Sequence, residues 1–214
     1  MDILPLAVWI GGNSLLALCP ILFAHLLVRS LSKPASQGSR RLAVIIPLLF
    51  LWIVFLPNTS YLLTEWRHFL DWVNAEPQYR QIYRDSQYPP GLTVRLMALA
   101  LCFFLFSSFG IVSLCLAVHP LESIVPERLR GSFKTGVFIL CSFGTYLGLV
   151  LRLNSFEIAS LSTLRGIAHG TLDVLRHPTL AIAVIVFGLL LWGIYEVLTP
   201  GIIRLMPRYR RAAA

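Results

Sequence analysis

A glutamate and a histidine three residues apart, Glu65 and His68, form the pattern with the clearest chemical meaning in this sequence of 214 residues. On a helix, the Glu-x-x-His spacing lets one face offer a carboxylate and an imidazole to a single metal ion. Glu157 and His169 would complete four ligands of the mixed oxygen and nitrogen kind that suits zinc, manganese or iron. We therefore predict a divalent metal site at Glu65, His68, Glu157 and His169, with Glu65, His68 and Glu157 as the catalytic residues.

Other polar residues gather around the two glutamates, in the stretches Phe55–His68 and Tyr146–Glu157. We expect six of them to bind a substrate: Asn58, Tyr61, Thr64, Tyr146, Arg152 and Asn154. A Glu-x-x-His pair also arises by chance, so two alternatives stay open. One is a structural charge network in which Arg152 pairs with Glu65 or Glu157 and joins two helix ends. The other is a binding site without chemistry.

The composition indicates what must position these residues. The chain is 57% hydrophobic and only 13% charged, with a mean hydropathy of +0.74, whereas a soluble domain has about 25% charged residues. The net charge of +8 is carried by basic residues at the ends of apolar stretches, not along one solvated face, which argues against nucleic acid as a partner. The lipid bilayer and its anionic headgroups are the expected partners.

Five apolar stretches are long enough to cross a hydrocarbon core of ~30 Å as helices. They are Leu4–Val28, Leu42–Leu56, Leu96–Val118, Thr135–Leu151 and Thr179–Leu198. The prediction is an all-α polytopic bundle of about five transmembrane helices, forming a single membrane domain over residues 1–214.

The loops carry an asymmetric charge that predicts orientation. Basic residues cluster after the first, third and fifth spans, whereas acids and bases nearly balance in 57–95 and 152–177. The positive-inside rule places the N-terminus outside and the C-terminal tail in the cytoplasm. A bacterial plasma membrane is the expected host, and a thylakoid membrane is the alternative.

Two segments on the outer side are predicted to be helical. Ser60–Trp72 follows the second span and is expected to be separated from it by Pro57. Ser155–Arg176 repeats leucine and isoleucine every three or four residues, with polar residues opposite, which predicts an amphipathic helix lying in the outer interface. Gly166 and Gly170 are expected to weaken that helix. In the fifth span, Glu196 is expected to reach the interface or pair with Arg204.

The two polar stretches resemble the signatures of domain-of-unknown-function family 1361, an uncharacterised family of bacterial multi-pass membrane proteins. The first signature, Phe-Leu-Pro-Asn-x-x-Tyr-x-x-Thr-Asp-x-x-His, aligns with Phe55, Leu56, Pro57, Asn58, Tyr61, Thr64, Glu65 and His68. The second, Tyr-Leu-Gly-x-x-x-Arg-x-Asn-Ser-Trp-Asp, aligns with Tyr146, Leu147, Gly148, Arg152, Asn154, Ser155, Phe156 and Glu157. This chain differs by having glutamate for both aspartates and phenylalanine for tryptophan. The resemblance implies the membrane fold and marks the polar residues, but implies no reaction.

Two functions therefore remain as expectations. The first is an accessory or assembly component of a larger membrane complex, without catalysis. The second is a metal-dependent enzyme or binder that acts on an anionic lipid-linked or small-molecule substrate at the outer leaflet. Arg152 would then face the anionic group.

Overall fold

The computed structural model describes residues 3–32, 38–75, 77, 90–151 and 160–206. These residues form helices and no strand, so the all-α prediction is confirmed for the described chain. The elements are α1 (Ile3–Leu31), α2 (Gly38–Phe55), α3 (Pro57–Tyr61), the 3-10 helix η2 (Leu62–Glu65), α4 (Trp66–Ala75), α6 (Pro90–Ile124), α7 (Glu127–Val150), α8 (Leu161–Arg176) and α9 (Pro178–Leu205).

Five helical segments are long and apolar enough to cross a membrane, as the sequence predicts. Four of them are α1, α6, α7 and α9, and the other runs from Arg41 to Ala75 through α2, α3, η2 and α4. Large apolar side chains stay exposed along these helices, for example Val186, Leu189 and Val197 on α9. Because such surface is stable in lipid and not in water, the chain is an integral membrane protein.

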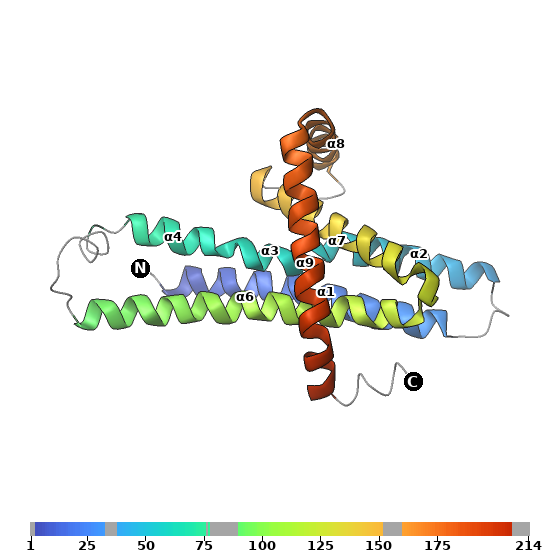
Figure 1. Ribbon diagram of the computed structural model, residues 1–214, viewed down its shortest axis with the longest axis horizontal. Coiled ribbons are helices and arrows are strands. Elements are labelled where there is room, and N and C mark those ends of the chain that lie inside the picture. The colour runs from blue at the N-terminus through green and yellow to red at the C-terminus, as the bar shows by residue number, and fades with distance from the viewer. Residues whose placement is uncertain (1–2, 33–37, 76, 78–89, 152–159, 207–214) are drawn as a thin grey trace.

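The second span continues beyond Pro57. The prediction that Pro57 separates Ser60–Trp72 from this span is therefore wrong. Only Leu56 interrupts the helix, and its backbone stays in the right-handed helical region at φ −57° and ψ −42°. Pro57 occupies the first turn of α3, where a missing N–H costs little. The chain therefore keeps its direction into η2 and α4 (Figure 1).

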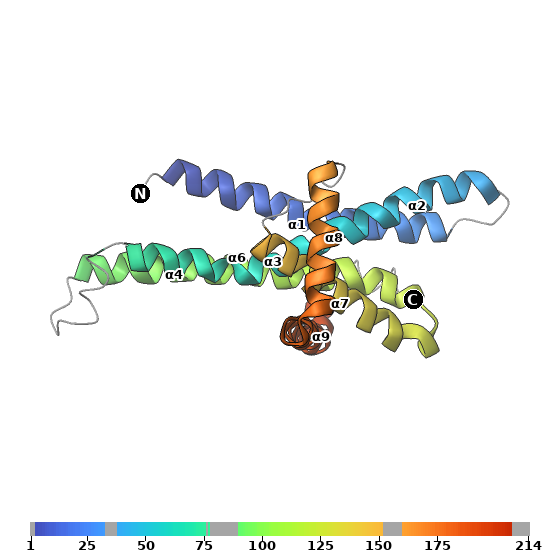
Figure 2. The same ribbon diagram turned by 90° about the horizontal axis from the view of Figure 1, so that it is seen from above.

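The helices cross at two very different inclinations. In Figure 1, α1, α2 and α6 lie along the long axis of the molecule, whereas α9 runs steeply across them. The view from above, in which α9 is seen end-on, agrees (Figure 2). The end of α1, the start of α2 and the turn between α6 and α7 lie at the same end of the molecule (Figure 1).

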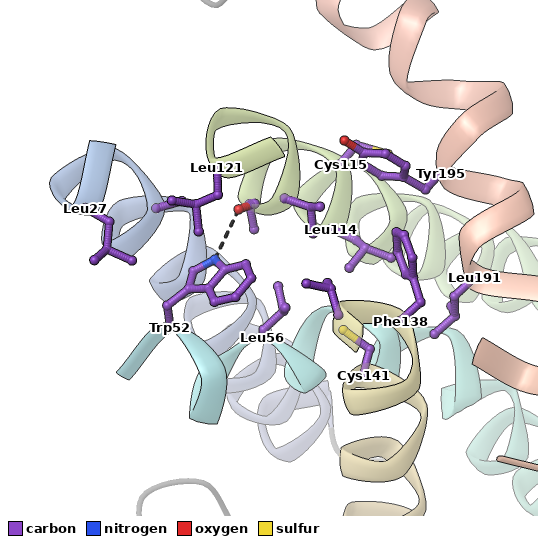
Figure 3. Close-up of a cluster of buried hydrophobic side chains, with 14 residues drawn as sticks. Leu27, Trp52, Leu56, Leu114, Cys115, Leu121, Phe138, Cys141, Leu191 and Tyr195 are labelled. Carbon is purple, nitrogen blue, oxygen red and sulfur yellow. Dashed lines mark hydrogen bonds between the residues drawn. The ribbon is translucent and has the colours of Figure 1, made fainter. Parts of the chain in front are cut away.

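Buried side chains from α1, α2, α6, α7 and α9 form the core (Figure 3). Trp52 is 2% exposed, and its indole Nε1–H donates to the carbonyl oxygen of Ala117 at 3.1 Å. Phe138 on α7 packs against Tyr195 on α9, with ring centroids 5.2 Å apart. Gly188 lets these two helices approach, because a Cβ there would lie 3.1 Å from the Phe138 carbonyl oxygen. The core thus holds the crossing helix in place.

The predicted amphipathic helix is present as α8, and its start is capped by Ser160, whose Oγ accepts from the Thr163 N–H at 3.1 Å. Gly170 is buried, and a Cβ there would lie 2.7 Å from a methyl group of Leu147. The glycine that was expected to weaken this helix is therefore the point where it packs on the end of α7.

Candidate functional site

The two polar stretches that lie far apart in the sequence meet in the structure, where α3 packs against α7. Ser60 Oγ and Thr145 Oγ1 are 2.9 Å apart, and both side chains are buried. Pro57 lies against Gly144, where an added Cβ would come within 2.5 Å of the proline Cβ. The absent side chain at position 144 thus lets the hydroxyl pair form. We call the residues of α3, η2, the first turn of α4 and the C-terminal half of α7 the Glu65 cluster.

A tightened turn places Glu65 inside this cluster. Residues Leu62–Glu65 are a 3-10 helix, and the Leu62 carbonyl oxygen accepts a hydrogen bond from Ser107 Oγ of α6 at 3.2 Å. Gly110 of α6 allows this approach, since a Cβ there would lie 2.6 Å from the Thr59 carbonyl oxygen. The 3-10 segment is therefore held against α6, and Glu65 is at its end.

The Glu65 carboxylate is the least solvated acid of the described chain. It is 1% exposed, and the side chain of Tyr61 lies within hydrogen-bonding reach of it. His68 Nε2 lies 3.4 Å from Glu65 Oε2, an ion-pair distance, so the two side chains of the Glu-x-x-His pair meet. Burying a carboxylate costs several kcal/mol unless a cation or hydrogen-bond donors compensate, which makes this position a candidate ligand site.

The imidazole of His68 connects the carboxylate to the surface. Its side chain is 44% exposed. The Trp9 indole of α1 packs edge-on against it, with ring centroids 5.3 Å apart. Trp9 also contacts Phe106 of α6 at 5.5 Å. Three helices thus orient the histidine beside the carboxylate while one side of its ring stays accessible.

Arg67 ties the cluster to the end of α7. Its Nη1 donates to the carbonyl oxygen of Leu149 at 3.3 Å. The second signature continues directly beyond this contact, from Leu151 into residues 152–159. The predicted site residues Arg152, Asn154 and Glu157 lie there, outside the described residues.

The remaining predicted substrate-binding residues lie on the cluster but make local contacts. Asn58 Nδ2 donates to the Phe55 carbonyl oxygen at 3.0 Å, and Thr64 Oγ1 donates to that of Tyr61 at 2.7 Å. Tyr61 is half-buried at the end of α3. Tyr146 is half-buried on α7, and its ring lies 6.2 Å from that of Phe143.

The predicted set of four metal ligands is only partly described. His169 is an exposed residue of α8. Within the described ranges no three histidine, cysteine, aspartate or glutamate side chains gather closely enough to hold a metal ion, so Glu65, His68 and His169 do not form such a group. The assignment of Glu157 stays a prediction.

Three contacts at the cluster were not predicted from the sequence: Ser60 with Thr145, Arg67 with Leu149, and Trp9 with His68. Ser60 and Thr145 each lie next to a signature residue, which is the only sequence signal that could have found them. Trp9 belongs to a charge-free span, where nothing distinguishes it from a lipid-facing aromatic residue.

Comparison with known proteins agrees with the resemblance of the two signatures. A family model described as "Protein of unknown function (DUF1361)" matches residues 12–194. No curated protein and no solved structure matches the chain. The match covers both signatures and all or most of each spanning helix, and the chain therefore belongs to the DUF1361 family.

Proposed function

We propose that this membrane protein binds a divalent cation in the Glu65 cluster. The observation that carries the proposal is the geometry of one pair of atoms: His68 Nε2 lies 3.4 Å from Glu65 Oε2. Two ligands that share one tetrahedral ion, with bonds of about 2.0–2.1 Å, are themselves about 3.4 Å apart. The pair thus has the spacing that a shared cation requires.

Burial supports the same proposal. The Glu65 carboxylate is 1% exposed, and a single hydrogen bond from Tyr61 replaces only part of its hydration, which a cation would compensate. A carboxylate and an imidazole suit zinc, manganese or iron better than magnesium or calcium. Further ligands would come from water, from the bound substrate or from Glu157, which follows the end of α7.

The bound cation would serve to hold an anionic group. Arg152 is the residue that we expect to share this anion, because the chain reaches it three residues after Leu149, where Arg67 is bound. The substrate class would be an anionic lipid headgroup or a small anionic molecule at the outer leaflet. Binding of the cation and the anion requires no general acid or base. An enzyme would also need Glu157 as the acid or base.

The orientation that supports an outer-leaflet site comes from charge. Arg29 and Arg41 lie at the end of the molecule where α1 and α2 meet, and Arg128 lies at the same end, near the start of α7. By the positive-inside rule this end faces the cytoplasm of a bacterial cell, which leaves the Glu65 cluster toward the outer side.

A second proposal, an accessory or assembly role, is favoured by a different observation. The Ser60–Thr145 contact and the bond from Arg67 to Leu149 both join the second span to the fourth. A cluster whose role is to fix the positions of the helices would need these two contacts between spans and would need no ligand. Stable co-purification with a larger complex would support this role.

A thermal-stability measurement in detergent distinguishes the two proposals. Zinc or manganese added at a hundredfold excess over Kd stabilises the binding state by about 2.7 kcal/mol, which raises the Tm by about 5–10 °C. We expect this rise in the wild type and in Asp71→Asn, an exposed acid of α4 that serves as the control. Glu65→Gln should lose it. An identical Tm with metal and with chelator in the wild type would favour the accessory role.

A further inference from the structure

A second polar site shares no residue with the Glu65 cluster and lies where the last turns of α6 and α9 approach each other. A pocket of about 340 Å³ opens there, within the range of about 300–1,000 Å³ typical of small-ligand sites. Its polar lining is His119, Glu122, Tyr195, Glu196, Thr199 and Arg204. Because α6 ends at Ile124 and α9 at Leu205, this pocket lies at the ends of two spans, the depth of lipid headgroups.

The two glutamates of the pocket are held by Lys134 and Trp192, which lie outside its lining, and by Tyr195, which is part of it. Lys134 of α7 lies 3.3 Å from Glu122 Oε1 and pairs with Glu196 Oε1. The Tyr195 hydroxyl donates to Glu122 Oε2, and the Trp192 indole donates to Glu196 Oε1 at 2.7 Å. Of the two alternatives expected for Glu196, reaching the interface or pairing with Arg204, the second is not seen, because Glu196 pairs with Lys134. With Lys134 and Arg204 against two carboxylates, the formal charges of the site balance.

One group of the pocket is a nearly buried hydroxyl. Thr199 is 7% exposed, and its side chain lies within hydrogen-bonding reach of the Cys115 thiol, which is a weak partner. Thr199 lines the pocket together with Arg204, so a hydroxyl donor and a guanidinium donor share one opening. Both are groups that bind phosphate oxygens.

The pocket also offers acceptors. Pro200 follows Thr199 inside α9 and has no N–H, so the carbonyl oxygen of Glu196 loses its usual helical donor four residues on. This backbone oxygen adds to the carboxylate of the same residue, whose side chain is 48% exposed. Carbonyl and carboxylate oxygens together suit an ammonium group that can donate hydrogen bonds.

We propose that this pocket binds a phosphoethanolamine group, with the phosphate on Thr199 and Arg204 and the ammonium on Glu196. A zwitterionic ligand matches the balanced charges, whereas a purely anionic ligand would meet two carboxylates. Its membrane source would be phosphatidylethanolamine, since Val197 and Leu205 beside the pocket are 77% and 84% exposed and offer an apolar path for acyl chains. A soluble phosphoethanolamine is the other source of the same group.

The test is lipid retention, measured by native mass spectrometry of the full chain purified in detergent and exchanged with defined lipids. We expect the wild type to retain phosphatidylethanolamine about tenfold better than phosphatidylcholine, whose quaternary ammonium has no N–H, and better than phosphatidylglycerol, which has no ammonium. If the three lipids are retained equally but soluble phosphoethanolamine displaces them, the pocket binds the phosphoethanolamine group and its ligand is the soluble compound.

Variants separate binding from folding. Thr199→Val removes the hydroxyl at nearly constant volume and should reduce retention roughly tenfold, whereas Thr199→Ser should keep it. Arg204→Gln should also lose the preference, and Arg128→Gln, an exposed arginine near the start of α7, is the control that should not. Equal retention of all three lipids without competition by the soluble group, or an unchanged preference in Thr199→Val, would overturn the proposal.

Discussion

The hydroxyl oxygens of Ser60 and Thr145 lie 2.9 Å apart, although the residues are separated by 85 positions in the chain. This contact joins the second and fourth spans at the point where the two family signatures meet. Ser60 Oγ also lies 3.0 Å from the Pro57 carbonyl oxygen, and Thr145 Oγ1 lies 2.9 Å from that of Cys141. Because each hydroxyl has one proton, one of the two donates to its own helix backbone while the other donates across the contact. The pair therefore couples two helix backbones through one contact between side chains.

A double-mutant cycle measures that coupling. Ser60→Ala and Thr145→Val should each lower the free energy of unfolding by about 1 kcal/mol, because a buried hydroxyl loses its partner. The coupling energy should be about 0.6 kcal/mol, the usual value for hydrogen bonds between membrane helices. Denaturant titration in detergent gives all four values. Additive losses would show that the two hydroxyls do not interact.

The packing of Gly144 predicts a contrast within one helix. Gly144→Ala would place a Cβ 2.5 Å from that of Pro57 and should cost about 1–3 kcal/mol of stability. Gly136→Ala, also on α7, meets no described atom within 4 Å and should be neutral or stabilising by up to about 1 kcal/mol. The difference in Tm between the two variants tests the close approach of α3 and α7, and equal Tm values would contradict it.

Lys134 should stabilise the crossing of α7 with α6 and α9. Lys134→Met leaves Glu122 and Glu196 without their shared cation and should lower the free energy of unfolding by about 1 kcal/mol. Lys134→Arg keeps the charge and should retain most of the stability. The measurement is the Tm of the three proteins at low and high salt. A Lys134→Met protein as stable as the wild type would show that the network contributes nothing.

The orientation can be tested with single cysteines in a chain whose own four are replaced. Ser32→Cys lies after α1, and Ala75→Cys lies at the end of α4. A membrane-impermeant maleimide should label Ala75→Cys in intact cells, and Ser32→Cys only after the cells are opened. Labelling in the reverse order would invert the proposed topology and move the Glu65 cluster to the cytoplasmic side.

Much of the fold could be predicted from the sequence, because length and apolar character define a spanning helix without reference to its neighbours. The five spans and the amphipathic α8 are of this kind. The sequence does not indicate which glycines lie at close contacts between helices. Small residues such as the adjacent Gly11 and Gly12 are typical of close helix packing in membranes, but an added Cβ at either would meet no described atom within 4 Å. Gly170, expected to weaken α8, is a packing point.

The candidate site was predictable in part. The spacing of Glu65 and His68 correctly brought their side chains together, because residues three apart on a helix share a face. The continuation of the span past Pro57 was not predictable, since a proline is tolerated or not according to the geometry of the preceding turn. The partners Thr145, Trp9 and Leu149 come from other helices, and only tertiary packing selects them.

The central claim, a cation held by Glu65 and His68, is tested most directly by the metal content of the purified protein. Elemental analysis should find close to one zinc, manganese or iron ion per chain in the wild type and in the Asp71→Asn control. The Glu65→Gln, His68→Ala double variant should contain none while staying folded. A wild type without metal, or a double variant that retains the same content, would contradict the claim.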